Sequence, residues 1–133
     1  MSGTAAMDFT MRAPAGRQIV DSYGDGRFRV SGARYQGSIL VFPDRTLAWP
    51  VADIDAIGLV TLDEVVRAGE SGAIEILLVG CGRRVTLLPE ALRRALRAAG
   101  VVTEAMDTGA ACRTYNVLAA EERRVAAALV AVP

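Results

Sequence analysis

The fold is predicted from the middle of the chain, residues 74–106, which read IEILLVGCGRRVTLLPEALRRALRAAGVVTEAM. Residues 74–79 are aliphatic apart from Glu75, as in a strand that is buried on both faces. Residues 89–99 then place Ala and Leu at helical spacing along one side, and a glycine separates this helix from a second strand at residues 101–106. A strand, a helix and a strand in this order predict two parallel strands joined by a right-handed crossover.

The same alternation extends in both directions from this segment. Towards the C-terminus, a helix is expected to begin at Thr108 or Gly109, and residues 125–132 read as a last aliphatic strand. Towards the N-terminus, residues 61–64 read Thr-Leu-Asp-Glu, which has the form of a capping box. This pattern predicts a further helix, which Gly69 is expected to end.

The N-terminal half of the chain is typical of antiparallel strands. Strands are predicted at residues 18–23, 27–30, 33–42 and 46–51, because Gly, Pro and Asp residues between them favour turns. Trp49 is expected to anchor the core. The whole order predicts an α/β (α+β) fold, in which an N-terminal antiparallel meander is followed by αβαβαβ and helices pack over a mixed β-sheet.

The chain length predicts a single domain, since its 133 residues fall within the range of about 100 to 200 that one domain occupies. Residues 1–17 lack a hydrophobic signal core and are expected to form a flexible N-terminus, and residues 18–133 a single α/β domain. The longest apolar stretch, residues 125–133, is far shorter than the roughly 18 residues that span a bilayer. We therefore expect no membrane insertion and a cytoplasmic location.

The composition excludes several classes of enzyme. All 15 basic residues are Arg, and the chain has neither Lys nor His. Schiff-base lysines, Walker phosphate loops, Ser-His-Asp relays and imidazole proton shuttles are therefore excluded. The 2 Cys residues cannot form a four-cysteine zinc site. A formal net charge of zero with 5% aromatic residues argues against nucleic acid as a partner. No catalytic residue, cofactor or metal is expected.

Two glycine-containing segments, residues 80–84 and 108–114, follow predicted parallel strands. Ligands of such sheets tend to bind beyond the carboxyl ends of the strands. A helix that begins near Thr108 offers free backbone N–H groups to an anion, and Arg83, Arg84 or Arg113 could reinforce such a site. In the alternative interpretation, the glycines form tight turns, Thr108 caps the helix and the arginines are solvated.

Cys81 and Cys112 fall at the same predicted edge of the sheet. A thiol near a helix N-terminus can have a lowered pKa and act in redox chemistry. The alternative is that both cysteines pack as small hydrophobic residues, as free cysteines usually do.

Several motifs resemble, in order and spacing, one known family. The motifs are Phe28-Arg29-Val30-Ser31-Gly32, Arg34-Tyr35 with Gly37-Ser38, Leu40-Val41-Phe42-Pro43, Trp49, residues 74–80 with Gly82, and Met106-Asp107-Thr108 with Ala111 and Thr114-Tyr115-Asn116-Val117-Leu118. The family consists of small α/β domains of unknown function and is shared by mitochondrial complex I assembly factor 3, the adipogenesis-associated single-domain protein and stand-alone bacterial and archaeal proteins. The resemblance extends from about residue 18 to residue 132.

The resemblance implies a three-layer fold with a mixed sheet and no established enzyme activity. It also implies a cleft between the Gly80-x-Gly82 loop and the helix that contains Thr108, Tyr115 and Asn116. For Asn116 the alternative is a structural hydrogen bond to a neighbouring loop, since Asn is a poor helix former. Together with the residues found above, the candidate ligand-binding set is Gly80, Cys81, Gly82, Arg83, Thr108, Gly109, Tyr115 and Asn116.

Two functional hypotheses follow. The first, motivated by the resemblance and by the missing catalytic residue types, is a non-catalytic protein-interaction domain that helps a respiratory or membrane complex to assemble. The second is a small-molecule or anion-binding domain, or a weak enzyme, which uses the cleft at the ends of the parallel strands. The partner of the first is another protein, and that of the second an anion or small molecule.

Overall fold

The computed structural model describes residues 7–8 and 16–133. Most of the expected flexible N-terminus, residues 1–17, lies outside the described residues. The elements are β1 (Met7–Asp8), β2 (Val20–Gly24), β3 (Arg27–Val30), β4 (Ala33–Gln36), β5 (Ile39–Val41), β6 (Thr46–Ala48), a short 3-10 helix (Ile54–Ala56), α1 (Asp63–Glu70), β7 (Ile76–Gly80), α2 (Glu90–Ala98), β8 (Val102–Met106), α3 (Thr108–Ala120) and β9 (Val125–Leu129). The predicted αβαβαβ order of the C-terminal half is confirmed.

The strands form two sheets. The larger sheet has the order β6-β5-β9-β7-β8, with β7 parallel to both β8 and β9 and with β5 antiparallel to both β9 and β6. The smaller sheet has the order β1-β2-β3-β4 and is antiparallel throughout. The α/β class and the mixed sheet predicted from the sequence are therefore confirmed.

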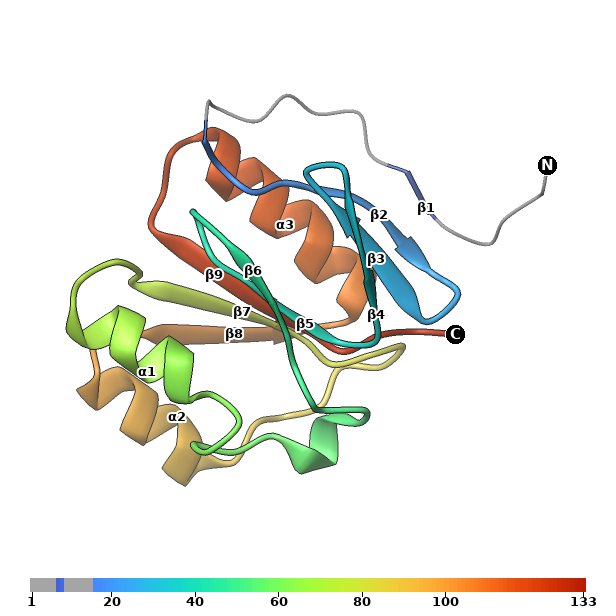
Figure 1. Ribbon diagram of the computed structural model, residues 1–133. Coiled ribbons are helices and arrows are strands. Elements are labelled where there is room, and N and C mark those ends of the chain that lie inside the picture. The colour runs from blue at the N-terminus through green and yellow to red at the C-terminus, as the bar shows by residue number, and fades with distance from the viewer. Residues whose placement is uncertain (1–6, 9–15) are drawn as a thin grey trace, which may run out of the picture.

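The larger sheet is the middle of three layers (Figure 1). The helices α1 and α2 cover one of its faces, and α3 together with the smaller sheet covers the other. Along β7, Leu77 and Val79 point into the first core, whereas Leu78 points into the second, because successive side chains of a strand face opposite ways. The three-layer arrangement implied by the resemblance is thus confirmed.

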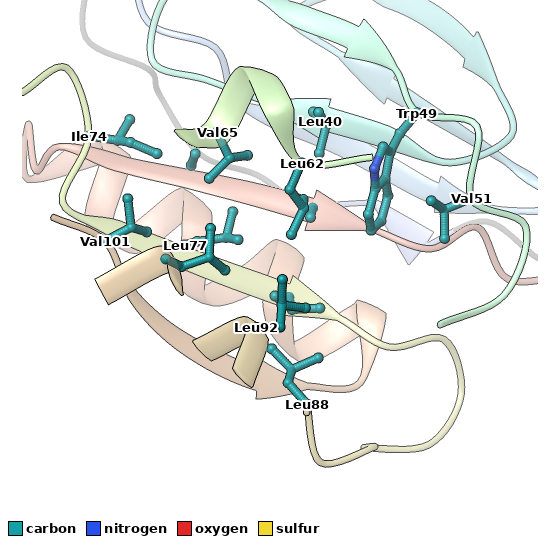
Figure 2. Packing of buried hydrophobic residues seen from close by; sticks show 14 of the residues in the cluster. Leu40, Trp49, Val51, Leu62, Val65, Ile74, Leu77, Leu88, Leu92 and Val101 are labelled. Atoms are coloured by element: carbon teal, nitrogen blue, oxygen red, sulfur yellow. The ribbon is translucent and has the colours of Figure 1, made fainter. Parts of the chain in front are cut away.

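Trp49 lies in the core under α1 and α2, as expected (Figure 2). Its ring is buried, and its Nε1–H donates to the carbonyl oxygen of Thr61 at 2.8 Å. Because the indole N–H has a partner, the ring can be buried without an unsatisfied polar group.

The single strand predicted at residues 33–42 is wrong. These residues form β4 and β5, which belong to different sheets. Gly37 separates them with a φ of 81°, in the left-handed region that glycine enters without strain. The following residue, Ser38, connects to the larger sheet, since its carbonyl accepts from Trp49 N–H and its Oγ accepts from Ala131 N–H.

The predicted start and end of α1 are also wrong. Thr61 does not cap the helix, because its hydroxyl exchanges hydrogen bonds with the N–H and C=O groups of Gly58. Gly69 lies inside the helix, which continues to Glu70. A Cβ at Gly69 would clash with Val101 and come within 2.6 Å of the carbonyl oxygen of Ala99. The glycine therefore allows a close approach between α1 and the end of α2, which the local sequence cannot reveal.

Candidate functional site

The candidate residues Gly80, Cys81, Gly82, Thr108 and Gly109 come together at one edge of the larger sheet. This edge forms because β7 is parallel to β8 and β9, so that Gly80 aligns with both Met106 and Leu129 at the strand ends. The backbone continues the alignment beyond the strands, since Cys81 N–H donates to the carbonyl of Met106 at 2.8 Å. The proximity predicted from the carboxyl-end rule is present in the structure.

Thr108 links three segments at this edge. Its N–H donates to the carbonyl of Gly82 at 2.8 Å, and its hydroxyl donates to the carbonyl of Val130 at 2.7 Å. The same hydroxyl accepts from the N–H of Gly82 at 3.0 Å, and the residue is fully buried. Thr108 therefore ties the ends of β7 and β9 to the start of α3.

The N-cap of α3 is Asp107, so the alternative interpretation is wrong in making Thr108 the cap. Asp107 accepts from the N–H of Ala110 through its Oδ1 at 2.8 Å. The N–H groups of Thr108 and Ala110, two of the first backbone donors of the helix, thus already have partners within the chain. A ligand anion at this end of α3 would have to compete with these groups, and no contact among the described residues favours the anion-binding hypothesis.

The glycines at the edge lie where neighbouring atoms leave little room. A Cβ at Gly80 would lie 3.0 Å from the Cα of Thr108, and one at Gly109 would clash with the ring and hydroxyl of Tyr23. Gly82 has a φ of 100°, which side-chain-bearing residues rarely adopt. Packing and turn geometry therefore account for these glycines.

Tyr115 and Asn116 do not share this edge. They lie two turns further along α3, about 11 Å from Thr108 at 1.5 Å per residue. Asn116 accepts from the N–H of Val20 and donates to its carbonyl, both at 2.9 Å, and is fully buried. The structural alternative for Asn116 therefore matches the contacts, since both side-chain atoms bind the first residue of β2.

The hydroxyl of Tyr115 also bonds within the chain. It lies 3.1 Å from the carbonyl oxygen of Gln18 and 3.3 Å from that of Phe42, so it can donate to either. Burial raises the pKa of Tyr115 above its ordinary value, which keeps the phenol protonated as a donor. Tyr115 and Asn116 thus attach α3 to the segment around β2.

The two cysteines lie on opposite sides of the larger sheet. Cys81 belongs to the core under α1 and α2, and Cys112 to the core under α3. Both are free and buried. Burial raises the pKa of Cys112 well above its ordinary value, so the thiol stays protonated and unreactive. The contacts match the alternative in which the cysteines pack as small hydrophobic residues.

The loop after Arg83 contributes to a different surface, which the sequence motifs did not indicate. Val85 and Leu87 in this loop are 61% and 81% exposed. Beside them is a hollow of about 300 Å³. We call this hollow and its lining the β8-edge surface, and its lining residues are Val85, Thr86, Leu87, Leu88, Arg93, Thr103, Glu104 and Ala105. A signal was present in the sequence, because residues 85–88 place three aliphatic side chains in a loop.

Neither a metal site nor a membrane span is found in the part of the chain that the structure describes. Residues 7–8 and 16–133 contain no group of three His, Cys, Asp or Glu residues that could hold a metal ion. Over the same residues, no helix is both long and apolar enough to cross a bilayer.

Comparison with known proteins gives one family and several relatives. The model of the family "Protein of unknown function (DUF498/DUF598)" matches residues 20–130. An uncharacterized protein of Rhodobacter capsulatus is 39% identical, with 90% of this chain and 89% of the relative covered. NADH dehydrogenase [ubiquinone] 1 alpha subcomplex assembly factor 3 of Xenopus tropicalis is 36% identical, and the match covers 84% of this chain but only 60% of that protein.

A solved structure shares the fold at high similarity. The crystal structure of a protein from Bartonella henselae, described as an outer membrane protein, superposes with a TM-score of 0.82 at 37% identity. The match covers 92% of this chain and 100% of that chain. These findings confirm the family resemblance that the sequence motifs indicate.

Proposed function

The chain belongs to the DUF498/DUF598 family of proteins of unknown function, and from this premise we propose that it is a non-catalytic protein-binding domain that helps a respiratory complex to assemble. The relative from Xenopus tropicalis, which its name describes as an assembly factor of NADH dehydrogenase, supports the proposal. This chain spans about 60% of that relative, so the role is carried over as a proposal for the shared domain.

The β8-edge surface is the observation that carries the proposal. Exposed apolar side chains gathered beside a hollow are typical of protein-interaction sites. Val85 and Leu87 expose most of their surface to solvent, whereas Leu88 in the same loop is buried in the core under α1 and α2. A partner that covers this surface would remove apolar area from water, which is the main favourable term in protein association.

The candidate ligand-binding residues give no support to an enzyme. Thr108, Tyr115 and Asn116 are buried and hydrogen-bonded within the chain, and their polar atoms hold elements together. Without His or Lys, the chain also lacks the usual proton shuttles and amine nucleophiles. These features favour binding over chemistry.

Deletion of the gene in the source cells tests the assembly role. We expect less fully assembled NADH dehydrogenase complex on native gels, with accumulation of subcomplexes, and recovery when the wild-type chain is restored. Restoring a Val117→Asp chain should also recover the complex, because Val117 is exposed on α3, away from the β8-edge surface. Normal amounts of assembled complex in the deletion strain would refute the proposal.

We also propose that the domain acts in the cytoplasm. The proposal is supported by the absence of a membrane-spanning helix among the described residues. The alternative is a location at the outer membrane, since the structural relative from Bartonella henselae is described as an outer membrane protein. Cell fractionation followed by immunoblotting of the untagged protein distinguishes the two, and recovery in the outer-membrane fraction after a high-salt wash would contradict the cytoplasmic location.

A further inference from the structure

The outer edge of β8 has backbone groups that no described strand uses. β8 ends the larger sheet, with β7 on its other side. The N–H of Val102 donates to the carbonyl of Glu75 at 3.0 Å, and the carbonyl of Met106 accepts from the N–H of Cys81 at 2.8 Å. Glu75 and Cys81 lie directly before and after β7, so the backbone groups of Val102 and Met106 point towards β7. Since this direction alternates along a parallel strand, the N–H and C=O groups of Thr103 and Ala105 point outward.

The same two residues line the hollow of the β8-edge surface. Its volume of about 300 Å³ is roughly twice that of an engineered ~150 Å³ cavity that holds benzene, so it accommodates an aliphatic side chain. Val85, Leu87 and Leu88 supply apolar walls. An open strand edge next to a side-chain pocket is the arrangement used for strand addition, in which backbone bonds give affinity and pockets give specificity.

Among the described residues, one arginine without an ion pair lines the hollow, and three more lie in the segments that form it. Arg93 lines it, and its Nε is buried without a hydrogen-bond partner. Arg97 lies one helical turn further along α2, and Arg83 and Arg84 directly precede Val85. Across the described ranges, none of these four arginines has an ion pair, whereas the neighbouring Arg94 pairs with Glu90. A buried guanidinium donor without a partner favours a carboxylate or carbonyl from outside.

The acidic lining residue Glu104 does not cancel this charge. Ala105 packs against the core under α1 and α2, so Thr103 shares that side of β8, and Glu104 alternates to the side of α3. The side of the edge that faces α2 therefore combines an apolar hollow with unpaired arginines.

We propose that an extended, acidic segment of another protein binds here by adding as a strand to the outer edge of β8. On its side towards α2, this segment carries carboxylates for Arg93 and Arg97 and an aliphatic side chain for the hollow. The inference rests on the proposed protein-binding function and specifies its surface and the chemistry of its partner.

A second copy of the chain fits less well. Antiparallel two-fold pairing of β8 with itself places both α2 helices on the same side of the joined sheet. Arg93 and Arg97 of the two copies would then approach each other, and like charges at such a junction are unfavourable. The charge pattern therefore favours a partner with acidic residues.

A synthetic peptide tests the chemistry on the full chain. The probe is Thr-Glu-Thr-Leu-Thr-Glu-Thr, labelled with fluorescein and titrated by fluorescence anisotropy. We expect binding that weakens as salt is raised, that falls at least tenfold for Arg93→Ala, and that changes less than twofold for Arg94→Ala. A peptide with Lys in place of Glu should bind at least tenfold more weakly. Equal binding of the two peptides, or no effect of Arg93→Ala, would overturn the proposal.

Backbone methylation tests the mode of binding. A strand that pairs along one edge uses the N–H groups of every second residue. Of two peptides, one N-methylated at Thr and the other at Glu and Leu, only one should lose binding by tenfold or more. An equal effect of the two, including no effect, would exclude strand addition.

Crosslinking in the source cells separates this inference from the proposed function. A photoreactive amino acid replaces Leu87 in one strain and, as control, the exposed Val117 on α3 in another. We expect one protein crosslinked through Leu87 and attached at an acidic segment identified by mass spectrometry. A partner crosslinked only through Val117 would leave the protein-binding function intact and refute the β8 site. A crosslink from Leu87 to a second copy, or to a segment without acidic residues, would also refute it, and no crosslinked protein at either position would contradict both.

Discussion

Replacement of Asn116 by Ala tests whether its amide holds the structure or a ligand. In the structure, the amide binds the N–H and the C=O of Val20 at 2.9 Å each, and all of these groups are buried. Asn116→Ala leaves the N–H of Val20 without a partner, which costs about 1–3 kcal/mol, and removes a second hydrogen bond worth about 1 kcal/mol. The free energy of unfolding should therefore fall by about 2–4 kcal/mol.

Such a loss is a large part of the total stability of a domain, which is typically about 5–15 kcal/mol. For a chain of 133 residues it corresponds to a decrease in Tm of roughly 10 °C. Guanidinium denaturation measures the loss through the fluorescence of Trp49, the only tryptophan, which is buried and should change its emission on unfolding.

The matched control is Val117→Ala, the next position on α3, where the side chain is 49% exposed. This change should alter stability by less than about 0.5 kcal/mol, as surface substitutions usually do. If Asn116→Ala lost less than about 1 kcal/mol, the hydrogen bonds to Val20 would not be the reason for the residue. A role in ligand binding would then regain support.

Three further predictions concern stability measured in the same way. Thr108→Val removes a buried hydroxyl that bonds to Val130 and Gly82, and it should destabilise by about 2–4 kcal/mol. Thr108→Ser keeps the hydroxyl and should lose about 1 kcal/mol, and equal losses would contradict the argument. Gly69→Ala should destabilise by about 1–3 kcal/mol through overpacking, and Gly58→Ala, where a Cβ meets no neighbour within 4 Å, by less than about 0.5 kcal/mol; the reverse order would refute the packing account. Burial raises the pKa of Cys112 above its ordinary value of 9.0, so the unfolded chain loses this proton at a lower pH than the folded chain. The free energy of unfolding should therefore fall above pH 9 by up to about 1.4 kcal/mol per pH unit. An equal fall with pH in Cys112→Ala would exclude this cause.

The elements of the C-terminal half could be predicted because their patterns are local. The start of α3 at Thr108 follows from the change from a strand pattern to a helical one, and β7 follows from an aliphatic run that ends in glycine. The parallel arrangement of β7 and β8 follows from the helix between them.

The failures lie where a distant contact decides the local structure. Residues 33–42 read as one strand, but β4 pairs with β3 and β5 pairs with β9, so the chain changes sheets at Gly37. Gly69 reads as a helix end, but it is glycine because Val101 and Ala99 pack against it. Neither partner can be identified from residues nearby in the sequence.

The candidate site shows the same division. The carboxyl-end rule predicted that Gly82 and Thr108 lie close together, and they do. It could not predict that their polar groups bind each other and Val130, because that depends on distances within about 3 Å. Tyr115 and Asn116 entered the candidate set through the resemblance, although their distance from Thr108 along a helix already separates them from that edge.

The sequence by itself determined the α/β class, the order of the C-terminal elements and the family, because periodicity and motif spacing are properties of neighbouring residues. It also determined that chemistry based on Lys or His is absent. Only the tertiary structure decided that the polar residues at the sheet edge bind one another, and that Arg93, Leu87 and the outer side of β8 share one exposed surface. The physical reason is that hydrogen bonding and exposure depend on which segments, distant in the chain, come within a few ångströms of each other.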